Sequence, residues 1–98
     1  MVRKSLFINA KDNVAMVLED AQKGDEIRTA AGSITLLDDV EFAHKVAVAD
    51  ISKRHGIYKY GEEIGYAKTA IPQGSWVHGH NMGCDRGTKK RGKDGERS

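Results

Sequence analysis

The sequence has little of several residue types, and each shortage excludes a class of protein. Its 98 residues include one cysteine, Cys84, so an intramolecular disulfide framework is excluded and a reducing compartment is favoured. Apolar runs such as residues 46–49 are far shorter than the roughly 20 residues that a membrane-spanning helix needs. Because no long apolar segment follows the charged start of the chain, we predict no signal peptide and a cytoplasmic location.

Familiar catalytic motifs are absent as well. The sequence contains no nucleophile elbow, phosphate-binding loop or dinucleotide-binding fingerprint, and no pair of acidic residues at a recognisable catalytic spacing. A chain of this length forms one small domain that buries only about 60 to 65% of its unfolded surface, so its stability is marginal. A partner subunit or a homo-oligomer would add buried surface. We do not expect an enclosed active-site pocket in this domain alone.

The charges are unevenly spread along the chain. Residues 86–98 carry six Lys or Arg against two acidic residues, a net charge of +4, whereas residues 1–85 carry ten basic and twelve acidic residues, a net charge of −2. A nucleic-acid-binding domain usually places its basic residues on a folded face among aromatic residues, and no aromatic residue follows Trp76. We therefore expect a solvated, flexible basic tail, with nucleic-acid attachment as a weaker alternative.

One segment has the spacing of a helix. The side chains of residues 11–13 can cap a helix N-terminus, and apolar residues then recur at i, i+3, i+4 and i+7, namely Val14, Val17, Leu18 and Ala21. The pattern predicts one short helix of about ten residues that ends at Lys23-Gly24.

The rest of the chain has the pattern of short strands separated by turns. We expect strands at residues 5–8, 26–30, 33–37, 44–49, 57–60, 64–67 and 75–81, with hairpins around residues 31–32 and 61–63. In the strand at 44–49, Val46 and Val48 are expected to point inward and Lys45 and Ala47 outward. Residues 51 and 57 match residues 71 and 77 at an offset of 20, which suggests two similar turn-plus-strand units. The predicted fold class is mostly β with one short helix.

The segment from His78 to Asn81 has the most specific chemistry. On a strand, His78 and His80 would share one face with their Cα atoms about 6.5 to 7 Å apart. Two such imidazoles could bind one metal ion, or one could act as acid or base while the other orients a substrate. With Cys84 they could supply three zinc ligands, although the spacing matches no standard zinc finger. The alternative is an exposed edge strand that carries polar histidines.

Two lysines offer a second kind of site. Lys59 lies beside Tyr60 and the turn at Gly61, where its ammonium group could contact a carboxylate. Lys45 follows His44 at the start of a predicted strand and could bind an anion in the same way. The alternative readings are a hairpin with an exposed lysine and a packed tyrosine, and a solvated strand start.

Four motifs in this order carry a family resemblance. The motifs Asp12-Asn13-Val14-Ala15, His44-Lys45-Val46-Ala47, Lys59-Tyr60-Gly61-Glu62-Glu63-Ile64-Gly65-Tyr66-Ala67 and Val77-His78-Gly79-His80-Asn81 together resemble the small N-terminal SAF domain of the altronate and galactarate dehydratase family. The resemblance covers roughly residues 5–81. It departs at Ala43, where glycine is expected, and in an unusual turn at residues 54–56. The chain from Met82 onward matches nothing in the family, so we expect a SAF domain over residues 1–81 and a basic, flexible tail over residues 82–98.

The resemblance implies a fold and a function. The fold would be the β-clip of SAF domains, and the chain would be the small subunit of a sugar-acid hydro-lyase that is inactive without a large catalytic subunit. That enzyme would eliminate water from a sugar acid to give a 2-keto-3-deoxy acid, with a divalent metal such as iron or manganese. A chain that ends at Ser98 resembles the split form of the family.

The resemblance also suggests roles for individual residues. His78 and His80 would act as acid, base or metal ligand. Lys45 or Lys59 would hold the substrate carboxylate, with Tyr60 and Asn81 as further substrate contacts. Two other functions stay open: the small subunit of a sulfolactate sulfo-lyase, which eliminates sulfite, and a non-catalytic module that binds a sugar acid or assists assembly.

Overall fold

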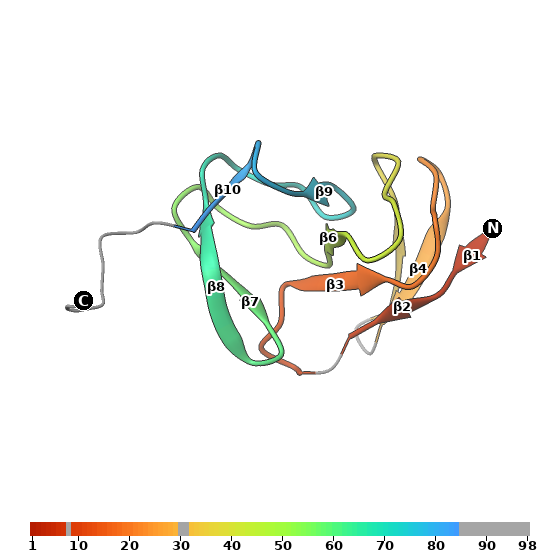
Figure 1. Cartoon of the computed structure of the whole chain (residues 1–98), viewed down its shortest axis with the longest axis horizontal. Coiled ribbons are helices and arrows are strands. Elements are labelled where there is room, and N and C mark those ends of the chain that lie inside the picture. Colours follow the sequence, from red (N-terminus) through yellow and green to blue (C-terminus); the bar gives the residue numbers. More distant parts are fainter. Residues whose placement is uncertain (8, 30–31, 85–98) are drawn as a thin grey trace.

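The regular structure of the chain consists of short strands. The computed structural model describes residues 1–7, 9–29 and 32–84, and every regular element within these ranges is a β-strand (Figure 1). In chain order the strands are β1 (Val2–Arg3), β2 (Ser5–Leu6), β3 (Val14–Val17), β4 (Glu26–Thr29), β5 (Gly32–Thr35), β6 (Lys45–Ala47), β7 (Gly56–Lys59), β8 (Glu62–Ala67), β9 (Trp76–Val77) and β10 (Met82–Gly83). The described part contains no helix with the length and apolar character that a membrane crossing requires. Met82 and Gly83, which were assigned to the predicted tail, form β10 and pair with β8. Residues 85–98 of that tail lie outside the described residues.

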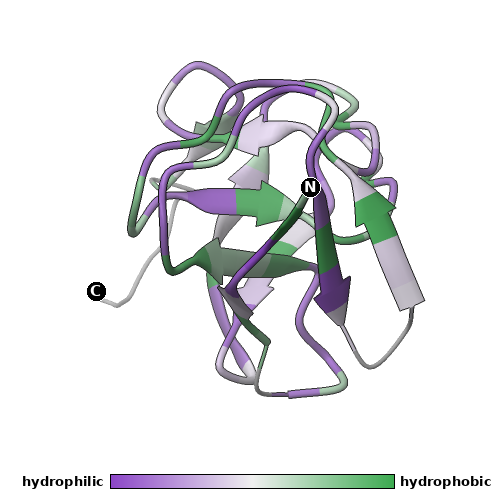
Figure 2. Ribbon diagram, turned by 90° about the vertical axis from the view of Figure 1, so that its right-hand side faces the viewer, coloured by the Kyte–Doolittle hydropathy of each residue, from purple (hydrophilic) through white to green (hydrophobic). Residues whose placement is uncertain are grey.

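A central sheet separates two hydrophobic cores. Its strand order is β2-β3-β6-β9, with antiparallel neighbours throughout. The β1-β4-β5 sheet lies toward one end of the molecule and the β10-β8-β7 sheet toward the other (Figure 1). The first core contains Ala15, Val17, Ala21, Ile27, Ile34, Leu36, Val40, Val46 and Val48, and the second contains Val14, Ala47, Ile51, Ile57, Ala67, Ile71 and Val77. Figure 2, viewed from the β1 end, shows hydrophobic segments in the strands and mainly hydrophilic loops around them.

Burial on both faces of the central sheet explains two wrong predictions. The segment expected to be helical forms strand β3 instead, because Val14 enters the second core while Ala15 and Val17 enter the first. A strand that is buried on both faces is apolar at nearly every position, so its sequence can imitate a helical repeat. For the same reason Ala47, predicted to point outward, is fully buried in the second core.

The expected pair of turn-plus-strand units is confirmed, and two further copies exist. Four segments share one pattern: an apolar bridge residue, a turn, and a strand whose second residue is buried. They are residues 21–27, 40–46, 51–57 and 71–77. Isolated bridges join them in pairs, Ala21 with Val40 and Ile51 with Ile71. The fold is therefore built from four similar corners around the two cores.

A positive φ angle at the fourth position of each corner explains where this chain departs from the pattern of the family that it resembles. The φ angles are 92° at Gly24, 72° at Ala43, 73° at Arg54 and 92° at Gly74. A turn with a positive φ at its third residue favours glycine, which has no Cβ to clash with the backbone. Glycine is thus the expected residue at position 43, and Ala43 adopts the same backbone conformation at a cost.

Asp12 and Asn13 cap a hairpin and not a helix. The buried Asp12 carboxylate accepts the backbone N–H groups of Tyr60 at 2.9 Å and Gly61 at 2.8 Å. The Asn13 amide accepts the Tyr58 N–H at 2.8 Å and donates to the Gly56 carbonyl at 2.9 Å. These bonds hold the β7–β8 hairpin against the start of β3.

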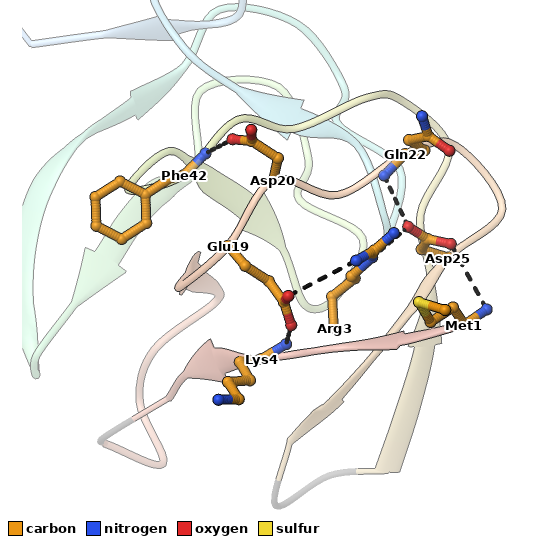
Figure 3. A network of polar contacts seen from close by, with 8 residues as sticks. All are labelled: Met1, Arg3, Lys4, Glu19, Asp20, Gln22, Asp25 and Phe42. Atoms are coloured by element: carbon orange, nitrogen blue, oxygen red, sulfur yellow. Dashed lines mark hydrogen bonds and ion pairs between the residues drawn. The ribbon is translucent and has the colours of Figure 1, made fainter.

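An ionic network fastens the start of the chain to the first corner (Figure 3). The Arg3 Nε donates to the Asp25 carboxylate at 2.8 Å, and the Gln22 N–H donates to the same carboxylate at 2.9 Å. The Met1 amino group lies 3.6 Å from the other Asp25 oxygen. The Arg3 hydrogen bond, followed by that from the Gln22 backbone, lowers the pKa of Asp25 below its ordinary value.

Candidate functional site

The two candidate catalytic histidines lie on a tight turn. Strand β9 ends at Val77, and the N–H groups of Asn81 and Met82 both donate to the His78 carbonyl, at 3.0 and 2.8 Å. The prediction of a strand through residues 75–81 is therefore wrong beyond Val77. The expectation that both histidines share one face of a strand therefore does not apply, because neither lies in a strand.

Asn81 closes this turn with its own side chain. Its Oδ1 accepts the His78 N–H at 2.9 Å, and its Nδ2 donates to the Trp76 carbonyl at 2.8 Å. The residue is only 6% exposed. Lys68 adds a second tether, because its Nζ donates to the Gly79 carbonyl at 2.8 Å. The geometry gives Asn81 a positioning role, and its predicted contact with substrate stays a prediction.

The histidines come together on the indole ring of Trp76. The ring centroid of Trp76 lies 5.1 Å from that of His78, with an interplanar angle of 11°, and 4.9 Å from that of His80. His44, in the corner before β6, stacks at 5.8 Å from Trp76 and 5.4 Å from His78. We call these four residues the Trp76 cluster. His78 and His80 are exposed, so the cluster presents two imidazoles to an incoming group.

Sequence reasoning did not find Trp76, and it named His44 as the neighbour of the anion-binding candidate Lys45. Strand β9 pairs with β6, with Lys45 opposite Val77 and Val46 opposite Trp76. This register brings the corner that contains His44 beside the histidine turn. The spacing of Trp76, His78 and His80 at i, i+2 and i+4 was a usable signal, but the pairing with β6 depends on the tertiary fold.

A shallow pocket adjoins the cluster. It has a volume of about 240 Å³ and is lined by Asp39, Glu41, His44 and Trp76. The Trp76 Nε1 donates to the His44 Nδ1 at 3.1 Å, and the His44 Nε2 lies 4.0 Å from a Glu41 carboxylate oxygen. The walls therefore combine an aromatic edge, an imidazole and two carboxylates.

The lysines lie on the other side of the central sheet. Lys45 shares a face with its pairing partners Met16 and Val77, and Val77 belongs to the second core, whereas Trp76 packs against the first. Burial lowers the pKa of Lys45, and the nearby positive charge of Lys59 lowers it further. The structure thus divides the predicted site residues into two groups.

The lysine group has the electrostatic character of an anion site. Within the described ranges neither Lys45 nor Lys59 forms an ion pair with a carboxylate. The Lys59 Nζ lies 4.9 Å from the centre of the Tyr60 ring, so Tyr60 orients this lysine through a cation–π contact. An anion between the two ammonium groups would relieve their repulsion.

The part of the chain that the structure describes does not form a complete metal site. Among those residues no group of three or more His, Cys, Asp or Glu side chains is arranged to hold a metal ion. The zinc interpretation that joined Cys84 to His78 and His80 is therefore wrong. The two histidines could contribute at most part of a coordination shell.

Comparison with known proteins decides the family. Residues 3–85 match the family model described as the altronate/galactarate dehydratase SAF domain. The chain belongs to this family. The matched range includes every residue of the Trp76 cluster as well as both lysines of the second group.

Individual relatives of this SAF domain are dehydratases and a lyase subunit. The chain is 45% identical to altronate dehydratase of Escherichia coli (strain K12) over 74 residues, which are 76% of the chain and 15% of that protein. It is 40% identical to galactarate dehydratase (L-threo-forming) of the same organism over 70 residues, 71% of the chain and 13% of that protein.

A third relative is (2R)-sulfolactate sulfo-lyase subunit alpha of Chromohalobacter salexigens, 35% identical over 49 residues. These are 50% of the chain and 52% of that subunit. The chain therefore spans about one seventh of the length of the dehydratases that it matches.

Proposed function

We propose that this SAF domain is the smaller part of a sugar-acid hydro-lyase and helps to form its active site with a larger catalytic polypeptide. The match over residues 3–85 carries the proposal, because the matched relatives are dehydratases and the match contains the exposed histidine turn. The low coverage of those relatives supports a larger catalytic region beyond this domain. In a sulfo-lyase the similar segment belongs to a named subunit, which supports assembly from separate chains as one route.

The residue types suit the elimination of water next to a carboxylate. That reaction removes a weakly acidic proton from the carbon beside the carboxylate and expels hydroxide from the next carbon. We assign the proton transfers to His78 and His80, which are exposed and are held on Trp76. One imidazole would take up the carbon-bound proton as base, and the other would protonate the departing hydroxide as acid.

Lys45 and Lys59 are proposed to bind the substrate carboxylate. Neither has a carboxylate partner in the described part of the chain, and the half-buried Lys45 is poorly solvated. An anionic ligand would compensate both charges. Since the lysines and the Trp76 cluster lie on opposite faces of the sheet, the substrate would have to span the end of β6 and β9, or the lysines serve a separate anion.

A divalent metal, iron or manganese, is also proposed for the assembled enzyme. The described residues do not fit a complete metal site, so most of its ligands would have to come from the larger polypeptide. The roles proposed for the residues of this chain do not depend on the metal.

A chimaera tests the proposal. The matching segment of the E. coli altronate dehydratase is replaced by this chain, and water elimination from altronate and galactarate is measured. We expect activity to return relative to the enzyme that lacks the segment. A correctly folded chimaera with no activity on either acid would contradict the proposal.

Two rival functions are separated by the choice of substrate and by histidine variants. A sulfo-lyase component would support elimination of sulfite from sulfolactate and not of water from the sugar acids, an idea that rests on the sulfo-lyase relative. A non-catalytic module would support turnover even when both histidines are replaced. The pattern of substrates and of histidine variants therefore distinguishes the three functions.

A further inference from the structure

The hydrogen bond between Trp76 and His44 fixes where the imidazole carries its proton. An indole nitrogen can only donate a hydrogen bond. The Trp76 Nε1 lies 3.1 Å from the His44 Nδ1, so this Nδ1 must be the acceptor and therefore carries no hydrogen. The single proton of the neutral His44 ring then resides on Nε2.

The protonated Nε2 belongs to the pocket beside the cluster. It lies 4.0 Å from a Glu41 carboxylate oxygen, longer than a hydrogen bond, and the Glu41 side chain is largely exposed. Asp39 lines the same pocket of about 240 Å³. The pocket thus offers the His44 N–H as a donor beside two carboxylates, of which that of Asp39 already accepts the Lys23 N–H at 2.8 Å through Oδ1.

A hydrogen-bond donor beside two carboxylates favours a hydroxyl group of a ligand at this position. A hydroxyl oxygen can accept from the His44 Nε2–H while its hydrogen is donated to Glu41 or Asp39. A carboxylate in the same position would be repelled by the two acidic side chains. A ligand that is a carboxylate at one end and a polyol at the other would therefore place a hydroxyl group here.

We propose that His44 forms a hydroxyl-binding subsite and that Trp76 is its positioning residue. The indole N–H sets the His44 tautomer, and the indole ring supports His78 and His80. The Trp76 side chain therefore positions all three histidines of the cluster. The inference rests on the proposed function for its substrate, but the tautomer can be measured on this chain alone.

The first test is nitrogen NMR of the full chain labelled with ¹⁵N-histidine, at a slightly alkaline pH. We expect the His44 Nδ1 to resonate as an unprotonated nitrogen and Nε2 as a protonated one. In Trp76→Phe, which keeps an aromatic ring but removes the N–H, both tautomers of His44 should become populated. His55, on a separate exposed turn, is the internal control and should not change.

Two results would overturn the positioning role. One is a His44 that carries its proton on Nδ1 in the unchanged chain, a measurement that needs no variant to fold. The other is a Trp76→Phe chain whose amide spectrum shows the native fold and whose His44 signals are unchanged.

The second test measures the contribution of the hydroxyl subsite to kcat/KM. In the chimaera, Trp76→Phe should lower kcat/KM for the polyhydroxy acid about two- to tenfold, the effect of one lost hydrogen bond. His44→Gln, whose amide can still donate, should retain more activity than His44→Phe. Equal losses in these two variants would contradict the hydroxyl subsite. An inactive parent chimaera would instead contradict the proposed function and leave the tautomer result standing.

Discussion

At the scale of single residues, backbone strain and an ionised side chain each affect the stability of this domain, and each effect can be measured separately. Ala43 and Arg54 occupy a backbone conformation that favours glycine, and Asp25 is an ionised group in a network with Arg3. The sequence alone marked Ala43 and residues 54–56 as departures from the family pattern. It did not give the reason, since the φ angle of a turn is imposed by the strands on either side.

Ala43→Gly should stabilise the domain. A residue with a Cβ pays roughly 1 to 2 kcal/mol for left-handed backbone, and glycine offsets part of this with its larger unfolded-state entropy. We expect the free energy of unfolding to rise by about 0.5 to 1 kcal/mol in chemical denaturation.

The comparison variants are Gly24→Ala and Gly74→Ala. Both positions have a φ of 92°, but a Cβ at Gly24 would meet open space whereas one at Gly74 would meet the Thr35 carbonyl oxygen. Gly24→Ala should therefore cost only the backbone strain and Gly74→Ala clearly more. A destabilised Ala43→Gly would show that Ala43 is not strained.

Asp25 should make the unfolding free energy of the domain depend on pH in the acid range. Its pKa is lowered in the folded state, so the ionised carboxylate stabilises the fold above its ordinary pKa of about 3.8, and this contribution is lost as the pH falls through the lowered value. Asp25→Asn should lower the thermal midpoint at neutral pH, and the gap to the unchanged chain should close in acid. Asp50→Asn, an exposed control, should show a smaller gap; a gap at Asp25 that does not change with pH would contradict this account.

At the scale of elements, the hairpins were more predictable than the segments between them. Gly32 and Gly61 marked the two predicted hairpins, which the pairings of β4 with β5 and of β7 with β8 confirm. The turn at residues 78–81 was missed although it contains Gly79, because the Asn81 side chain closes it through hydrogen bonds that the sequence does not show. Strand β3 was missed because burial on both faces leaves no strand alternation to detect.

The Asp12 contacts predict a large stability effect for one buried side chain. Asp12→Ala leaves the N–H groups of Tyr60 and Gly61 without their acceptor, which should cost about 2 to 4 kcal/mol of unfolding free energy. Amide exchange at Tyr60 and Gly61 should also accelerate. Asp50→Ala, which removes an exposed acceptor of the Gln73 N–H, should cost less than about 1 kcal/mol. Similar losses for the two variants would show that Asp12 is not a hairpin anchor.

At the scale of the whole molecule, the domain is a scaffold that holds the candidate site side chains at its surface. Four similar corners enclose two small cores. The central sheet holds the Trp76 cluster on one face and Lys45 on the other, where Lys59 at the end of β7 lies near Lys45. The β-rich fold and the family could be predicted from the ordered motifs. The division of the candidate site into two groups could not, because it depends on which face of β6 each side chain occupies.

The central claim is that the histidine turn takes part in catalysis by a larger enzyme. Its most direct measurement is the rate of altronate dehydration by the chimaera with His78→Ala and His80→Ala, beside the matched control His55→Ala on another exposed turn. Proton transfer by a positioned group contributes about 10²- to 10⁴-fold. We expect the double variant to lose at least about a hundredfold in kcat while His55→Ala keeps the parent rate. An assembled, folded double variant that turns over altronate at the parent rate would contradict the account.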